Sequence, residues 1–144
     1  MSGAPYLLAP ESMAELGSGQ EFETVEGRMP RAITPITMEF EANYGGPVVQ
    51  AFTHFGILPE VARVWREGGV TGFTTAEMVC RPSPEALTDT PDFEPPQYDQ
   101  LILTQNDTQD VYKDPQRNYI RLSERAKVLL EQFDLGWCAI LPAE

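Results

Sequence analysis

His54, Cys80 and Cys138 have the side chains of this sequence best suited to nucleophilic or metal chemistry. A Ser-His-Asp or Cys-His catalytic site could be built only around His54, because the sequence contains one histidine. Both cysteines lie in expected strands, where a cysteine usually acts as a small buried apolar residue. A zinc site from these three would have no compact ligand spacing and would need a fourth ligand. We therefore expect neither catalytic residues nor a metal or cofactor, and a small enzyme using His54 is the alternative.

Carboxylates are concentrated in two polar loops of the sequence. Asp107, Asp110 and Asp114 do not have the spacing of an EF-hand, nor its central glycine. Acidic side chains beside exposed aromatic rings fit a protein-binding patch, in which a charged rim surrounds aromatic anchors. Phe93, Tyr98 and Tyr112 could supply those rings, or they could equally pin the loops onto the core. The expected partner-binding residues are Asp89, Asp92, Phe93, Glu94, Asp107, Asp110 and Tyr112.

The charge balance restricts the kind of partner. Acidic residues number 22 and basic residues 10, which gives a formal net charge of −12 in 144 residues. Phosphate backbones and anionic lipid surfaces require clustered lysine and arginine, so we expect neither nucleic acid nor membrane binding. A basic protein would instead be attracted and steered towards this chain.

The length and the cysteine content indicate the class of protein and its compartment. A chain of 144 residues is expected to form one domain, and two cysteines cannot build a disulfide framework. The first residues carry no basic segment followed by a long apolar run, and no stretch reaches the length of a membrane span. We therefore expect a cytoplasmic protein.

Alternating and helical spacing of apolar residues predicts the elements that position these side chains. Residues 1–30 have little periodicity and are either an ordered part of a sheet or a peripheral arm. Residues 81–97 contain five prolines and are expected to be a loop. Expected strands cover residues 32–44, 48–52, 72–80, 98–104, 119–122 and 137–141, and expected helices cover 58–67 and a segment capped by Ser123.

Two of these segments align with each other without gaps. LPEVARVWREGGVTGFTTAEM, from Leu58, aligns with LSERAKVLLEQFDLGWCAILP, from Leu122, and the glycine pair Gly72 and Gly136 keeps its place. Any two amphipathic helices share some residues, which is the simpler explanation. A true repeat would give two strand–helix–strand units, at about 47–80 and 119–142. The expected fold is α+β, with a mixed, mainly antiparallel sheet and a few short helices packed on it.

The run from Gly69 to Phe73 (GVTGF), and the ending that begins Leu122-Ser123-Glu124-Arg125 and closes at Pro142, resemble small immunity-like proteins of bacterial toxin systems. The similarity is to the double-CxxCG family and its relatives, over roughly residues 47–144, although this chain has no CxxCG motif. The resemblance implies an immunity protein, monomeric or homodimeric, that blocks a cognate toxin by stoichiometric occlusion. A structural or adaptor subunit of a larger assembly is a further alternative.

Overall fold

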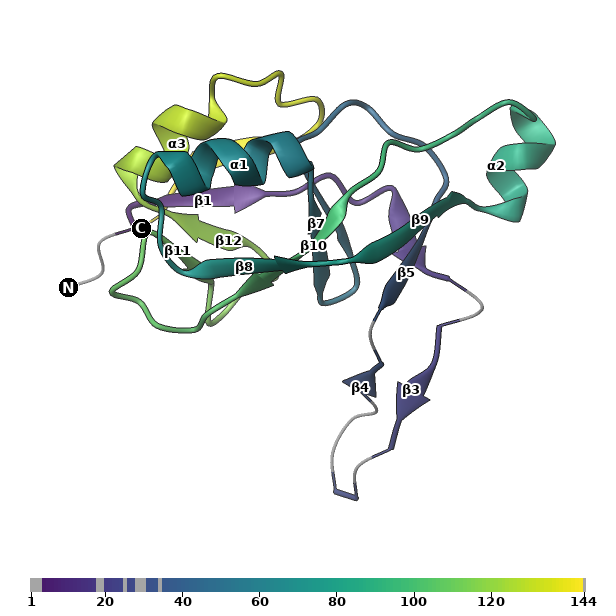
Figure 1. The fold of residues 1–144 in the computed structure, drawn as a ribbon, viewed down its shortest axis with the longest axis horizontal. Coiled ribbons are helices and arrows are strands. Elements are labelled where there is room, and N and C mark those ends of the chain that lie inside the picture. Colours follow the sequence, from purple (N-terminus) through teal and green to yellow (C-terminus); the bar gives the residue numbers. More distant parts are fainter. Residues whose placement is uncertain (1–3, 18–19, 25, 28–30, 34, 144) are drawn as a thin grey trace.

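The structure is a computed structural model that describes residues 4–17, 20–24, 26–27, 31–33 and 35–143. It confirms the α+β class: short strands form mostly antiparallel sheets, and short helices pack on them (Figure 1).

The first sheet brings the two ends of the described chain together. Its order is β11-β12-β1-β13, and every pairing in it is antiparallel. Strand β1 lies between the last two strands, with Leu8 opposite both Ile120 and Ile140. Part of the segment 1–30 is therefore an interior strand. The strands of this sheet are β1 (Tyr6–Ala9), β11 (Val111–Lys113), β12 (Ile120–Leu122) and β13 (Ala139–Pro142).

The second sheet has the order β6-β7-β10-β8 and is also antiparallel. A tight turn at Phe52-Thr53 joins β6 to β7, and Phe52 adopts a left-handed backbone conformation with φ 57°. The predicted strands 48–52 and 98–104 are confirmed here. The strands are β6 (Val48–Ala51), β7 (His54–Ile57), β8 (Phe73–Ala76) and β10 (Asp99–Leu103).

A third sheet pairs β5 with β2 in antiparallel and with β9 in parallel orientation. Ile36, Met38 and Phe40 of β5 are buried, which confirms the predicted strand in that segment. A small hairpin, β3 with β4, projects away from the rest of the molecule (Figure 1). These strands are β2 (Ala14–Leu16), β3 (Phe22–Glu23), β4 (Arg31–Ala32), β5 (Ile36–Phe40) and β9 (Met78–Pro82).

Helices α1 (Pro59–Glu67) and α3 (Glu124–Leu130) pack against each other on one side of the strands (Figure 1). Both were predicted from the spacing of their apolar residues. Trp65 is fully buried between them, and its indole N–H donates to the Ala126 carbonyl at 3.1 Å. The Ser123 hydroxyl caps α3 by accepting from the Ala126 N–H, as its position predicted.

Helix α2 (Pro84–Asp89) was not expected, because its segment is rich in proline. Proline is tolerated in the first turn, where its missing N–H has no intrahelical acceptor. Ser83 precedes Pro84, and its hydroxyl accepts a hydrogen bond from the Ala86 N–H at 3.1 Å. The predicted loop over residues 81–97 is therefore wrong for its first half.

The two segments of the proposed repeat have the same order of elements. Each runs from a strand through a helix to a glycine with positive φ, Gly72 at 104° and Gly136 at 56°, and then to another strand. The second strands enter different sheets. Common descent of the two units stays a prediction.

Candidate partner-binding site

The expected partner-binding residues fall on two separate surfaces. One group lies at the end of α2 and in the loop that follows, whereas the other lies in the connection between β10 and β11 and on β11 itself. Figure 1 shows α2 at one end of the long axis and β11 towards the other. The single combined surface that the sequence suggested is therefore wrong. The first group is Asp89, Asp92, Phe93 and Glu94, and the second is Asp107, Asp110 and Tyr112.

Two of the aromatic anchors are core residues. Tyr112 is 2% exposed, and the Arg121 guanidinium lies 5.7 Å from its ring centroid. Tyr98 is fully buried, and its hydroxyl donates to the Gly46 carbonyl at 2.8 Å and accepts from the Asn43 amide. Burial raises the pKa of Tyr98 to about 12. The expectation that these rings are exposed is wrong, because both lie in or beside strands and are buried in the fold. The second reading, that they fix the loops to the core, describes them correctly.

The Asp110 side chain stabilises the fold through hydrogen bonds to two other segments. Its carboxylate accepts from the Thr71 N–H at 2.9 Å, the Thr71 hydroxyl at 3.1 Å and the Ser123 hydroxyl at 2.6 Å. Burial alone would raise the pKa of Asp110, but these hydrogen bonds and the Arg125 charge outweigh it and lower the pKa. The side chain joins the loop after α1 to the start of α3. It is therefore a poor candidate for a partner contact.

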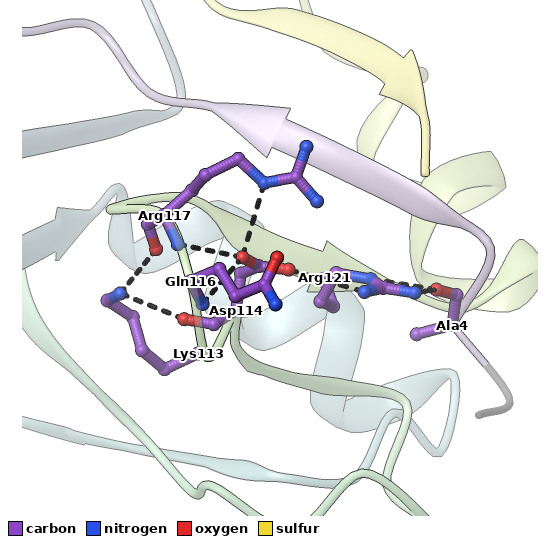
Figure 2. A network of polar contacts seen from close by, with 6 residues as sticks. All are labelled: Ala4, Lys113, Asp114, Gln116, Arg117 and Arg121. Atoms are coloured by element: carbon purple, nitrogen blue, oxygen red, sulfur yellow. Dashed lines mark hydrogen bonds and ion pairs between the residues drawn. The ribbon is translucent and has the colours of Figure 1, made fainter. Parts of the chain in front are cut away.

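Asp114, which the sequence placed in the same polar loop, is the centre of a buried polar network (Figure 2). Its side chain is 1% exposed and forms ion pairs with Arg117 at 3.3 Å and Arg121 at 3.2 Å. It also accepts from the backbone N–H groups of Gln116 and Arg117. Arg121 in turn donates to the Ala4 carbonyl. The network ties the β11–β12 hairpin to the start of β1.

The remaining acidic residues are free to meet a partner. Asp89, Asp92, Glu94 and Asp107 are exposed, and Phe93 is half-buried. Leu87 on α2 is 40% exposed beside them. Residues 82–112 contain seven carboxylates and no lysine, arginine or histidine. This run of negatively charged residues is the sequence signal for a local acidic surface. The net charge of the whole chain does not reveal where on the chain the acidic residues lie.

A cavity of about 700 Å³ opens beside β7, β10 and β11. It brings His54 together with Asp107 and Tyr112, which the sequence had assigned to a different function. No described side chain hydrogen-bonds the His54 imidazole, and neither cysteine is among the described lining residues. Burial lowers the pKa of His54, so the ring is neutral near pH 7. The lining residues are Thr53, His54, Phe55, Gln100, Leu101, Ile102, Leu103, Gln105, Asp107, Tyr112, Lys113, Asp114 and Pro115.

We expect stability to decrease as the pH falls through 6.5, the ordinary pKa of histidine, and to level off below the lowered pKa of folded His54. The unfolded chain binds the proton more readily than the folded one, so protonation favours unfolding. Asp107, Asp114, Tyr112 and Lys113 also line this cavity. Urea midpoints measured between about pH 7.5 and 5.5 should show this slope in the wild type and lose it in His54→Gln. An equal slope in both proteins would contradict the assignment to His54.

A stacked aromatic pair that faces solvent lies elsewhere, and no sequence pattern indicated it. Tyr44 and Trp137 stack with ring centroids 3.8 Å apart and an interplanar angle of 5°. Tyr44 is 41% exposed and Trp137 65% exposed, so the stack faces solvent. The sequence placed Tyr44 at the end of one strand and Trp137 at the start of another, whereas both belong to loops.

A buried carboxylate holds the two loops together. Glu11 is 2% exposed and accepts from the N–H groups of Tyr44 at 2.7 Å, Gly46 at 2.9 Å and Trp137 at 3.2 Å. Gly136 permits this approach, because its φ is 56° and an added Cβ would lie 2.5 Å from the Gly46 nitrogen. Glu11 thus positions both aromatic residues through their own backbones.

Comparison with protein-family models, with curated proteins and with solved structures finds no match to this chain. Among the described residues no helix has the length and apolar character needed to span a membrane. Within the same residues no group of three or more histidine, cysteine, aspartate or glutamate side chains is placed to hold a metal ion.

Proposed function

We propose that this protein binds a partner protein and blocks it by stoichiometric occlusion, as an immunity protein does with its cognate toxin. The observation that carries the proposal is the solvent-facing stack of Tyr44 and Trp137. Tryptophan and tyrosine are enriched among the few residues that dominate the binding energy of interfaces. The similarity of the segments around Gly69–Phe73 and Leu122–Pro142 to immunity proteins supports the same reading.

The stack is held in place before any partner arrives. Burying a carboxylate costs several kcal/mol unless hydrogen bonds satisfy it, and the three backbone N–H groups around Glu11 do so. Because both rings project into solvent, the stack contributes little to the packing of the hydrophobic core. A rigid aromatic anchor loses little conformational entropy on binding, which raises affinity.

The charge around the stack favours a basic partner. Exposed Glu41 lies in the loop that leads to Tyr44, and exposed Asp134 lies in the loop that leads to Trp137. Neither forms an ion pair with a described residue. Together with the acidic run over residues 82–112, they would steer a cationic toxin towards this protein. We expect the protein to act in the cytoplasm and to remain monomeric or homodimeric until the toxin binds.

Capture of a partner tests the proposal. A tagged protein drawn from its native lysate should recover one near-stoichiometric protein that is toxic when expressed alone. Trp137→Ala should weaken that complex by about 2 kcal/mol, or roughly thirty-fold in Kd, because it removes the larger ring of the stack. Binding of the purified pair, measured by calorimetry, gives this difference directly.

Phe22→Ala is the matched control, because Phe22 is 51% exposed but lies on the projecting β3–β4 hairpin. That variant should bind like the wild type. A toxin bound equally well by Trp137→Ala would remove the stack from the interface. Recovery of the protein alone, or capture of a protein whose toxicity is not reduced by co-expression with this chain, would reject the inhibitor function itself.

A further inference from the structure

We propose that the His54 cavity binds the guanidinium group of an arginine side chain presented by the partner protein. This inference rests on the proposed function, and it adds a second, deeper contact to the aromatic stack. The cavity, the unsatisfied acceptor of Gln100 and the charge balance of the lining residues favour a planar cation with many N–H donors.

An unsatisfied acceptor oxygen belongs to a residue that lines the cavity. Among the described residues, three buried side-chain oxygens have no hydrogen-bond partner: those of Gln50, Gln100 and Asn118. Gln50 lies on β6, Gln100 lies opposite Gly56 of β7, and the Asn118 amide donates to the Phe52 carbonyl. Buried acceptors without a donor are destabilising. Of these three residues, Gln100 is the one among the described lining residues of the cavity, so a ligand there that donates N–H groups would remove that cost for Gln100.

Gln100 places one of these acceptors at the cavity. The residue is 9% exposed and lines the space together with His54. Strand alternation turns Gln100 and Ile102 to the face of the sheet opposite Leu101, which packs into the core with Phe55. A neutral imidazole offers a further acceptor nitrogen, and burial keeps His54 neutral. Gln100 and His54 thus present hydrogen-bond acceptors rather than positive charge.

The charges around the cavity also favour a cation. Asp107 is exposed at its edge and has no ion-pair partner among the described residues. Lys113 is the basic residue among the described lining, and its ammonium donates to the carbonyls of Asp114 and Arg117 (Figure 2). An incoming cation would therefore meet a carboxylate at the edge, while the Lys113 ammonium remains hydrogen-bonded to backbone.

The turn beside the cavity exposes an aromatic ring. Phe52 is 69% exposed and has φ 57°, a conformation that two-residue β-hairpin turns require. The ring stands next to Thr53 and His54 in sequence, and an arginine stem or guanidinium plane could pack on it.

Arginine fits this site better than lysine does. A guanidinium carries five N–H donors in a rigid plane, whereas an ammonium carries three on a strongly hydrated point charge. Gln100, His54 and Asp107 offer acceptors of three different kinds, which a planar fork can engage together. The side chain of Ile102, which shares the sheet face of Gln100, would cover part of the methylene stem.

The single histidine makes the test direct, because its ring protons give one resolved set of NMR signals. The probe is N-acetyl-arginine methylamide, titrated into the isolated protein at constant pH and ionic strength. The His54 signals should shift in a saturable manner with this compound. The citrulline analogue, which has the same shape without the charge, and the lysine analogue should bind at least about fivefold more weakly.

Substitutions at single residues then test where the arginine compound binds. Gln100→Met keeps the side-chain volume but removes the acceptor, and Asp107→Asn removes the charge; each should weaken the arginine compound by about fivefold. Asp92→Asn, at the far α2 surface, should leave it unchanged. Backbone NMR spectra confirm that each variant is folded. His54 signals that do not move, or that move equally with the citrulline compound, would overturn the proposal.

The same titration separates this inference from the proposed function. A negative titration alongside capture that depends on Trp137 rejects the arginine site and leaves the inhibitor standing. A positive titration in a protein that captures no partner rejects both the inhibitor function and the assignment of the ligand to a protein side chain.

Discussion

Gly72→Ala is expected to destabilise the protein by at least about 4 kcal/mol, enough to abolish folding in a domain of ordinary stability. Gly72 has φ 104°, and an added Cβ would lie 2.0 Å from the Val111 carbonyl oxygen. The chain cannot move away, because the Gly72 carbonyl accepts from Thr104 and the neighbouring Thr71 carbonyl accepts from Val111. Soluble expression and urea unfolding measure the effect.

Gly45→Ala is the control for backbone strain alone. Gly45 has φ 85°, yet nothing lies within 4 Å of its added Cβ. It should lose only about 1 kcal/mol, the usual cost of alanine at positive φ. Equal stability of the two variants would show that the contact between Gly72 and β11 is loose.

The second large effect is expected from Asp114→Asn, which should lower stability by about 3 kcal/mol. The substitution keeps the shape of the side chain but leaves Arg121, whose side chain is 18% exposed, without its opposite charge. Backbone and arginine hydrogen bonds lower the pKa of Asp114 despite the opposing effect of burial. Its contribution is therefore complete above the ordinary value of 3.8 and is lost as the pH falls through the folded pKa.

Urea midpoints at about pH 7 and pH 3 give both parts of this prediction. The variant should be less stable at neutral pH and should lose less stability on acidification than the wild type. Asp107→Asn is the control, since Asp107 is exposed and outside the network. A variant as stable as the wild type would mean that solvent, not Asp114, balances the Arg121 charge.

Local sequence patterns predicted the elements whose spacing is regular. The alternation at Ile36, Met38 and Phe40 gave β5, and the apolar stripe ending in Trp65 gave α1. The pattern failed at α2, where proline content outweighed the capping residue Ser83. The pattern was inconclusive at β1, because a short apolar run forms a strand only when distant segments pair with it. Here those segments are β12 and β13.

The site was harder to predict, since each of its parts depends on contacts between distant segments. Tyr98 and Tyr112 were expected to be exposed beside the acidic loops, but contacts with distant segments bury both. Tyr44 and Trp137 lie 93 residues apart and meet only because Glu11 binds the backbone of both loops. No local pattern indicates that a glutamate near the start of the chain positions a tryptophan near its end.

The position of β1 also determines when the fold can form. Residues 6–9 are made before their neighbours in the sheet, β12 and β13, which follow more than a hundred residues later. At about 5–20 residues per second, the apolar strand waits of the order of ten seconds before its partners exist. During that interval Leu7 and Leu8 are exposed to chaperones and to other nascent chains. Pairing over so long a separation also predicts slow folding after release.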